Sequence, residues 1–165
     1  MLLAIVLTSI LAADSGAGIH WTAPSNWKSE GERPMRLATY RVPSASGDQE
    51  GGECAVYYFG QGQGGSVEAN IDRWKGQFQG SKDTPKVEKR TIHSLKITTL
   101  DVSGAYTGMG GPRAPQGPPK QGYRLLGAVV EGPQGSIFFK FAGPMKTVAQ
   151  NQSAFEKMLS MLSPQ

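Results

Sequence analysis

Chemically reactive side chains are scarce in this chain. It has one cysteine, Cys54, and two histidines, His20 and His93, among 165 residues. A single cysteine excludes an intramolecular disulfide and every zinc or redox motif that needs two thiols. The two histidines form neither an HExxH motif nor an i, i+4 pair, so a histidine zinc site is not expected. We therefore predict no metal and no cofactor.

Long hydrophobic segments are equally scarce. The longest begins at Leu2 and ends at Ala13, and a dozen residues is short of the roughly 20 that a membrane-spanning helix needs. Small and polar residues follow it, which is typical of a secretory leader and its cleavage region. We predict that residues 1–18 are a signal peptide or N-terminal leader. Because no Lys or Arg precedes the apolar run, a start further upstream or a buried N-terminal strand are the alternatives.

A strong charge of one sign is also absent. The chain has 17 Lys and Arg against 13 Asp and Glu, a net charge of +4, and these residues are scattered along it. A nucleic-acid interface would gather basic residues on one face, so no nucleic-acid partner is predicted. Once the leader is removed, no stable membrane span is expected. The leader also predicts an extracytoplasmic location, either periplasmic or secreted.

Alternating apolar residues predict strands along most of the chain. In "MRLATYRV", Ala38, Tyr40 and Val42 alternate with their neighbours, and "ECAVYYF" follows after a polar turn, which indicates an antiparallel hairpin. Two further strands are predicted in "KVEKRTIHSLKITTLDVSG" and two in "YRLLGAVVEGPQGSIFFKFAGP". In the first of these stretches, the alternation of Leu95 and Ile97 is out of phase with that of Leu100 and Val102. A bulge near Thr98 and Thr99 would bring the two pairs onto the same face.

Two segments have helical spacing. Val67, Ile71, Trp74 and Phe78 form one apolar stripe, and Ser66 is placed to cap the helix. The second helix is predicted in "KTVAQNQSAFEKMLSML". Residues 104–122 are dense in Gly and Pro and are predicted to be a mobile loop.

The order of these elements predicts an α+β fold, in which an antiparallel sheet of about six strands is covered by two main helices. The length fits a single domain over residues 19–165. The succession "WTAPSNW", "MRLATY", "YYFGQGQGGSVEANIDRWKGQF", "YRLLGAVVEG" and "FFKFAGP" resembles a family of uncharacterised exported bacterial proteins with the PsbP-like fold. The resemblance implies an α/β/α sandwich that binds protein partners without catalysis.

Gly60, Gly62 and Gly65 spell GxGxxG between a predicted strand and a predicted helix. A dinucleotide site needs a parallel βαβ unit, whereas the hairpins around this motif are antiparallel. The motif is therefore interpreted as a flexible turn. The alternative is a small-ligand or anion site at Gly62, Gly64, Gly65 and Ser66, where free amides meet a helix N-terminus.

Catalytic residues are not predicted. Ser66 lies in "GGSVE" and lacks the second glycine of a nucleophile elbow. A hydrolase that pairs Ser66 or another serine with His93 is therefore the weakest hypothesis. An aromatic cleft formed by the tryptophans with Tyr57 and Tyr58 is a further alternative to their packing in the core. The leading prediction is a non-catalytic accessory or protein-binding module of the cell envelope, with an unidentified protein partner.

Overall fold

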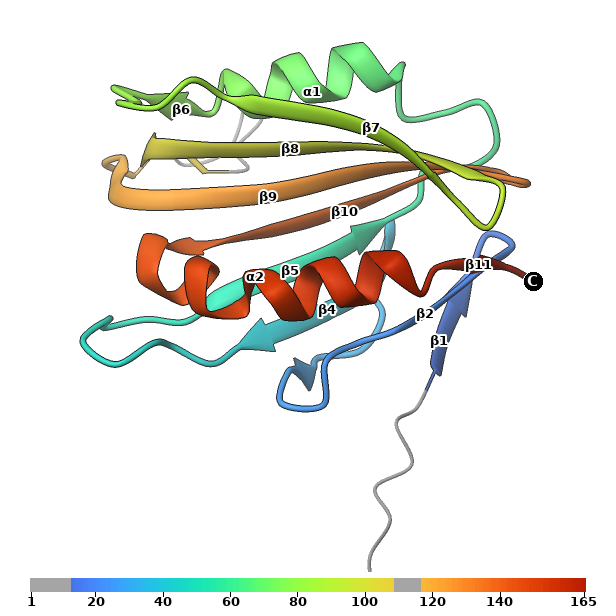
Figure 1. Ribbon diagram of the computed structural model, residues 1–165, viewed down its shortest axis with the longest axis horizontal. Coiled ribbons are helices and arrows are strands. Elements are labelled where there is room, and N and C mark those ends of the chain that lie inside the picture. The colour runs from blue at the N-terminus through green and yellow to red at the C-terminus, as the bar shows by residue number, and fades with distance from the viewer. Residues whose placement is uncertain (1–12, 109–116) are drawn as a thin grey trace, which may run out of the picture.

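One antiparallel sheet of eight strands forms the centre of the protein (Figure 1). The computed structural model describes residues 13–108 and 117–165. The strands of the main sheet are β3 (Lys28–Ser29), β4 (Arg36–Val42), β5 (Gly52–Tyr57), β6 (Phe78–Gln79), β7 (Lys86–Ile92), β8 (Leu95–Tyr106), β9 (Lys120–Gly132) and β10 (Gly135–Pro144). Their order is β3-β4-β5-β10-β9-β8-β6, and β7 also pairs with β8.

A small second sheet and two helices complete the described chain. The small sheet has the order β1-β2-β11 and consists of β1 (Ala13–Gly16), β2 (Ile19–Thr22) and β11 (Ser163–Pro164). The helices are α1 (Val67–Lys75) and α2 (Met145–Ser160). Neither helix is both long and apolar enough to cross a membrane.

The predicted α+β class and both predicted helices are confirmed, but the count of about six strands is too low. The first helix is also shorter than predicted, because α1 ends at Lys75 and Phe78 lies in β6. All six predicted strands are present, as β4, β5 and β7 to β10. The two additional strands, β3 and β6, have two residues each. A segment that short has no detectable periodicity, because its pairing depends on the neighbour that it meets in the folded sheet.

Both faces of the main sheet carry an apolar core, and β8 contributes to each. Leu95 and Ile97 lie in one core, whereas Leu100 and Val102 lie in the other. The pairing of β8 with β7 and β9 runs without interruption past Thr98 and Thr99. The predicted bulge at these residues is therefore wrong, because the change of phase reflects a change of face. The register shift of β8 against β9 falls between Gly104 and Tyr106 instead.

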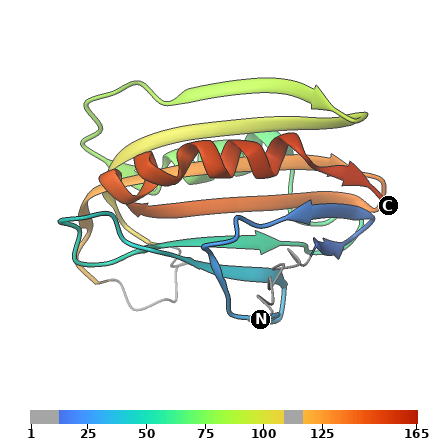
Figure 2. The ribbon, with the colours of Figure 1, turned by 60° about the horizontal axis from the view of Figure 1, so that its bottom comes forward.

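The α2 helix and the small sheet cover one face of the main sheet (Figure 2). Phe155 of α2 packs against Phe141 of β10, with ring centroids 5.8 Å apart. Trp21 of β2 meets Phe139 edge-on at 5.7 Å. All four side chains are at most 2% exposed, so this face holds a continuous aromatic core.

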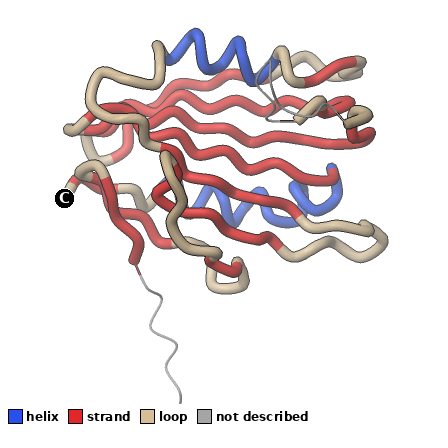
Figure 3. The backbone as a smooth tube through the Cα atoms, turned by 180° about the vertical axis from the view of Figure 1, so that it is seen from behind, coloured by secondary structure: helices blue, strands red, loops and turns tan. Residues whose placement is uncertain are grey.

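The α1 helix covers only part of the opposite face. Ser66 caps it as predicted, because its hydroxyl accepts a hydrogen bond from the Ala69 amide. Ile71 and Trp74 point into the second core, and Trp74 lies directly over Gly127 of β9. Within the main sheet, α1 contacts mainly β8 and β9. Seen from behind, the neighbouring strands on that side carry no helix within the described residues (Figure 3).

The predicted loop over residues 104–122 is shorter in the structure, because strands extend into both of its ends. β8 continues to Tyr106 and β9 begins at Lys120. The rings of Tyr106 and Tyr123 stack at 5.8 Å and both are buried, which holds these residues in the sheet. Residues 109–116 lie outside the described residues.

The predicted leader over residues 1–18 falls mainly outside the described part, which begins at residue 13. Residues 13–16 form β1 and pair with β2. Asp14 also accepts a hydrogen bond from the hydroxyl of Tyr40, which in turn accepts one from the Trp21 indole at 2.8 Å. This part of the predicted leader is therefore tied to the folded domain.

The close approach of α1 to the sheet predicts that a methyl group at position 127 is not tolerated. A Cβ there would lie 2.6 Å from ring carbons of Trp74, so Gly127→Ala should displace α1 and lower the free energy of unfolding by about 1–3 kcal/mol. Urea denaturation measures this change. Gly117→Ala, whose Cβ would meet no atom within 4 Å, is the matched control and should change stability by less than about 0.5 kcal/mol. Equal stabilities of the two variants would contradict the packing.

Candidate functional site

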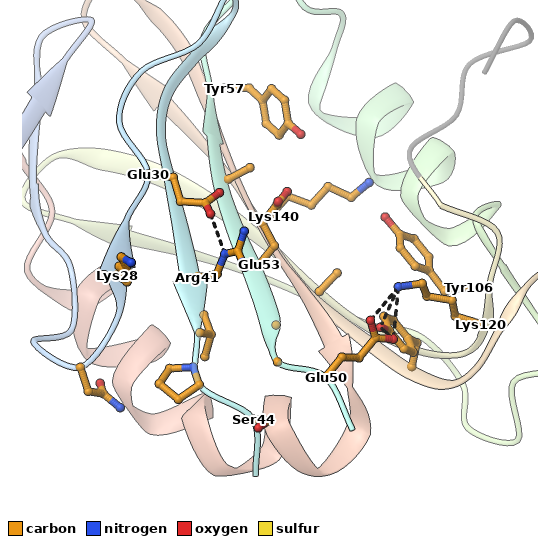
Figure 4. A pocket seen from close by; sticks show the side chains of 18 residues that line it. Lys28, Glu30, Arg41, Ser44, Glu50, Glu53, Tyr57, Tyr106, Lys120 and Lys140 are labelled. Atoms are coloured by element: carbon orange, nitrogen blue, oxygen red, sulfur yellow. Dashed lines mark hydrogen bonds and ion pairs between the residues drawn. The ribbon is translucent and has the colours of Figure 1, made fainter. Parts of the chain in front are cut away.

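The part of the sheet that α1 leaves uncovered is hollowed into a cleft with a volume of about 630 Å³ (Figure 4). Its floor comes from β5, β9 and β10, and one wall comes from β3 and β4. The side chains used below are Lys28, Glu30, Arg41, Glu50, Glu53, Ala55, Tyr57, Tyr106, Lys120, Tyr123, Lys140 and Ala142, all of which line it.

The cleft exists because the residues beside Lys140 are small. Lys140 of β10 lies in register between Ala55 of β5 and Gly127 of β9. Gly127 allows Trp74 to sit on the sheet, which places α1 against one side of Lys140. Ala55 has only a methyl group, so the sheet surface on the other side stays low. Lys140 therefore lies at the boundary between the covered and the open half of this face.

Lys140 is buried although it is a lysine. The residue is 4% exposed, and its Nζ donates a hydrogen bond of 2.5 Å to Oε1 of Gln77, just after α1. Nζ lies 6.0 Å from the centre of the Trp74 ring and 5.8 Å from that of Tyr106. Both distances are within reach of a cation–π interaction. The two rings and the Gln77 amide thus form part of the surroundings of the amine.

This environment disfavours the charged form of Lys140. Burial lowers the pKa of Lys140 to about 7, and the positive charges of Arg73 on α1 and Arg36 on β4 act in the same direction. Glu53 on β5 opposes them. Desolvation and like charges both penalise an ammonium group, so a substantial fraction of this amine is neutral at neutral pH.

Two tyrosine hydroxyls point toward the end of the Lys140 side chain, from Tyr57 on β5 and Tyr106 on β8 (Figure 4). Burial raises the pKa of both tyrosines above the usual value. Both hydroxyls therefore keep their protons near pH 7 and can donate hydrogen bonds to a molecule in the cleft.

Ion pairs fix the rim of the cleft. Arg41 donates to Glu30 at 2.6 Å, and Lys120 reaches Glu50 at 3.0 Å. The hydrogen bond from Arg41 lowers the pKa of Glu30. The Tyr123 hydroxyl also donates to Glu50 and lowers its pKa. The rim thus presents charges of both signs beside aromatic rings.

The residues predicted to bind a ligand, Gly62, Gly64, Gly65 and Ser66, lie at the other end of α1 from Lys140. All three glycines have positive φ angles, as a tight turn requires. The Asn70 amide donates to the carbonyl groups of Gly64 and Ser66 at 2.8 Å each. The cleft and three smaller cavities of the described residues are lined by other side chains. Ligand binding by this loop stays a prediction.

The other singled-out residues do not come together. His93 lies in the turn between β7 and β8, where its Nδ1 is 2.8 Å from the Leu162 carbonyl oxygen, whereas Ser66 caps α1. Cys54 is fully buried on the α2 side, and burial raises the pKa of its thiol. Within residues 13–108 and 117–165, no three metal-ligating side chains form a group.

The aromatic residues divide between the cores and the cleft. Trp21 and Trp27 lie in the α2 core and Trp74 in the α1 core, as the packing interpretation predicts. Tyr57 lines the cleft. Tyr58 instead donates a hydrogen bond of 2.6 Å to the carbonyl group of Gln134, in the turn between β9 and β10.

Sequence reasoning missed Lys140. A signal was present, because the residue is the one charge in the apolar strand "IFFKFAG". Such a strand is buried on both faces, so a lysine within it must either reach solvent or lie buried beside an open site. Only the position of α1 shows whether the lysine reaches solvent or lies buried beside an open site.

Comparisons with known proteins support the fold. No protein-family profile and no curated protein matches the chain. Among solved structures it is similar to cyanobacterial PsbP (CyanoP) from Synechocystis sp. PCC 6803, at 13% identity and a TM-score of 0.54 over 99% of each chain. It is also similar to PA94 from Pseudomonas aeruginosa, a protein of unknown function and candidate regulator, at 12% identity and a TM-score of 0.54, over 88% of this chain and 91% of the other. The predicted PsbP-like fold is confirmed.

The burial of Lys140 predicts a stability that rises with pH. In the unfolded chain the amine has its ordinary pKa of 10.5, whereas in the folded chain the pKa is about 7. Between these values the unfolded state binds more protons, so raising the pH favours the folded state. Relative to Lys140→Met, the wild type should gain up to about 1.4 kcal/mol per pH unit from about pH 7 to pH 9.

Urea denaturation at a series of pH values measures this difference. Lys96→Met removes an exposed lysine of β8 and is the matched control. If Lys140→Met and Lys96→Met differed from the wild type by the same amount at every pH, the environment described for Lys140 would be wrong.

Proposed function

We propose that this chain is a non-catalytic binding module, a PsbP-like α/β/α sandwich that works outside the cytoplasm. In this proposal a segment of a protein partner occupies the cleft beside Lys140. The observation that carries it is the cleft of about 630 Å³ on the α1 face, over which the described residues place no helix.

The composition of the cleft fits a polypeptide partner. Tyrosines are enriched in the energetically important parts of protein interfaces, since they combine a large apolar ring with a hydroxyl. Tyr57, Tyr106 and Tyr123 stand around the floor. The ion pairs of the rim offer both carboxylates and cations to a partner's backbone and side chains, as is usual at the edge of an interface.

The location outside the cytoplasm rests on the N-terminal sequence. The apolar run from Leu2 to Ala13, followed by small and polar residues, is typical of an export leader. An accessory protein of the cell envelope would meet its partner after export. The non-catalytic assignment is the expectation that the PsbP-like resemblance carries.

Site-specific photocrosslinking in cells tests the cleft as the partner site. Tyr57 is replaced by p-benzoylphenylalanine, which keeps the phenyl ring and adds a photoreactive benzoyl group to it. Val87, an exposed residue of the outer strand β7, is replaced in a control chain. We expect a discrete protein adduct from position 57 that is absent from position 87. Mass spectrometry identifies the adduct.

A second substitution links the adduct to the cleft itself. Ala142→Trp places a large side chain in the cleft and should reduce the yield of the adduct about tenfold or more, the effect of losing about 1.4 kcal/mol of binding. Circular dichroism establishes that the variant is folded. The same adducts from positions 57 and 87, or an adduct that a folded Ala142→Trp chain retains, would overturn the proposal.

A further inference from the structure

Lys140 differs from every other lysine of the chain. All ten lysines lie in the described residues, and Lys140 alone is classed as buried, at 4% exposure. Eight of the others are exposed, and Lys75 is intermediate. The buried amine nevertheless adjoins an open cleft, since the Lys140 side chain forms part of the lining.

We propose that the Lys140 amine is a carbonyl-binding group that forms an imine with a small aldehyde or ketone in the cleft. This site goes beyond the proposed protein partner and does not depend on it, because it concerns the chemistry of one amine. A lysine that is desolvated and held near other cations is the form in which proteins use this side chain as a nucleophile.

The groups around the amine match that requirement. Burial and the positive charges of Arg73 on α1 and Arg36 on β4 favour the neutral form, while Glu53 on β5 and the faces of the Trp74 and Tyr106 rings favour the charged one. With a pKa of about 7, the neutral fraction at pH 7 exceeds that of an ordinary lysine by about a thousandfold. Gln77 accepts a hydrogen bond from Nζ, which holds the amine beside the end of α1.

The tyrosines can complete the reaction. The neutral amine attacks the carbonyl carbon, the new C–N bond forms, and the carbonyl oxygen is protonated to a hydroxyl. That hydroxyl leaves as water when the nitrogen loses its second proton and the C=N bond forms, so no oxidant or reductant is required. Tyr57 and Tyr106 point toward Nζ (Figure 4) and keep their protons near neutral pH, so they can donate to the oxygen at both stages.

Reductive labelling of the intact protein tests the site. The chain is incubated at pH 7 with propionaldehyde and sodium cyanoborohydride, which converts an imine into a stable secondary amine, and peptide mapping gives the labelling rate of each lysine. Lys140 is expected to react at least about tenfold faster than the mean of the exposed lysines. Because each lysine is followed in the wild-type protein, the comparison does not depend on a variant that folds.

Matched variants and a denatured sample define the outcome. Lys96→Arg, at an exposed position of β8 outside the cleft, should leave the labelling of Lys140 unchanged within about twofold, whereas in urea Lys140 should react at the same rate as the other lysines. Tyr106→Phe should slow the labelling of Lys140 while the protein stays folded by circular dichroism. A Lys140 rate in the native protein at or below that of the exposed lysines would overturn the proposal, even if the crosslinked partner at Tyr57 were found.

Discussion

The packing of the Trp74 indole on Gly127 is the contact on which the candidate site depends. A helix of nine residues is not stable alone in water, and α1 is held in place by the few apolar side chains that it buries. Gly127 lets the indole reach the sheet backbone. The same contact sets Arg73 and Gln77 beside Lys140, and the helix ends there. The position of this one ring therefore decides both what encloses the amine and where the cleft begins.

The two faces of the main sheet contribute differently to the stability of the fold. The α2 face holds the longer helix, the small sheet and a core of large aromatic and aliphatic residues, and burial of such side chains is the main source of stability. The α1 face carries the smaller core and the buried lysine. A buried amine lowers stability wherever it must lose its proton. A domain can retain a destabilising residue on one face of its sheet when packing on the opposite face supplies enough stability. A trade-off between stability and function is common at functional sites.

The sequence predicted the parts of the fold that repeat along the chain. The stripe of Ile71 and Trp74 is a local pattern, and so is the alternation of Tyr40 with Val42, and both are confirmed. The pairing of β3 and β6 could not be predicted, because two residues contain no period. The cleft could not be predicted either, since it depends on which strands α1 fails to cover. The glycine motif predicted a ligand site at the first turn of α1, whereas the buried amine of Lys140 lies beside Gln77, just after the last turn of this helix.

The distribution of the tryptophans gives this protein a built-in optical signal. Trp21 and Trp27 are buried in the core beneath α2, and their emission reports on the integrity of that core. Trp74 belongs to the opposite core, and its ring centre is 6.0 Å from the Lys140 nitrogen. Emission from an indole responds to nearby charge, so Trp74 senses the protonation of its neighbour. One chain thus carries, without any dye, separate fluorophores for the α2 core and for the surroundings of Lys140.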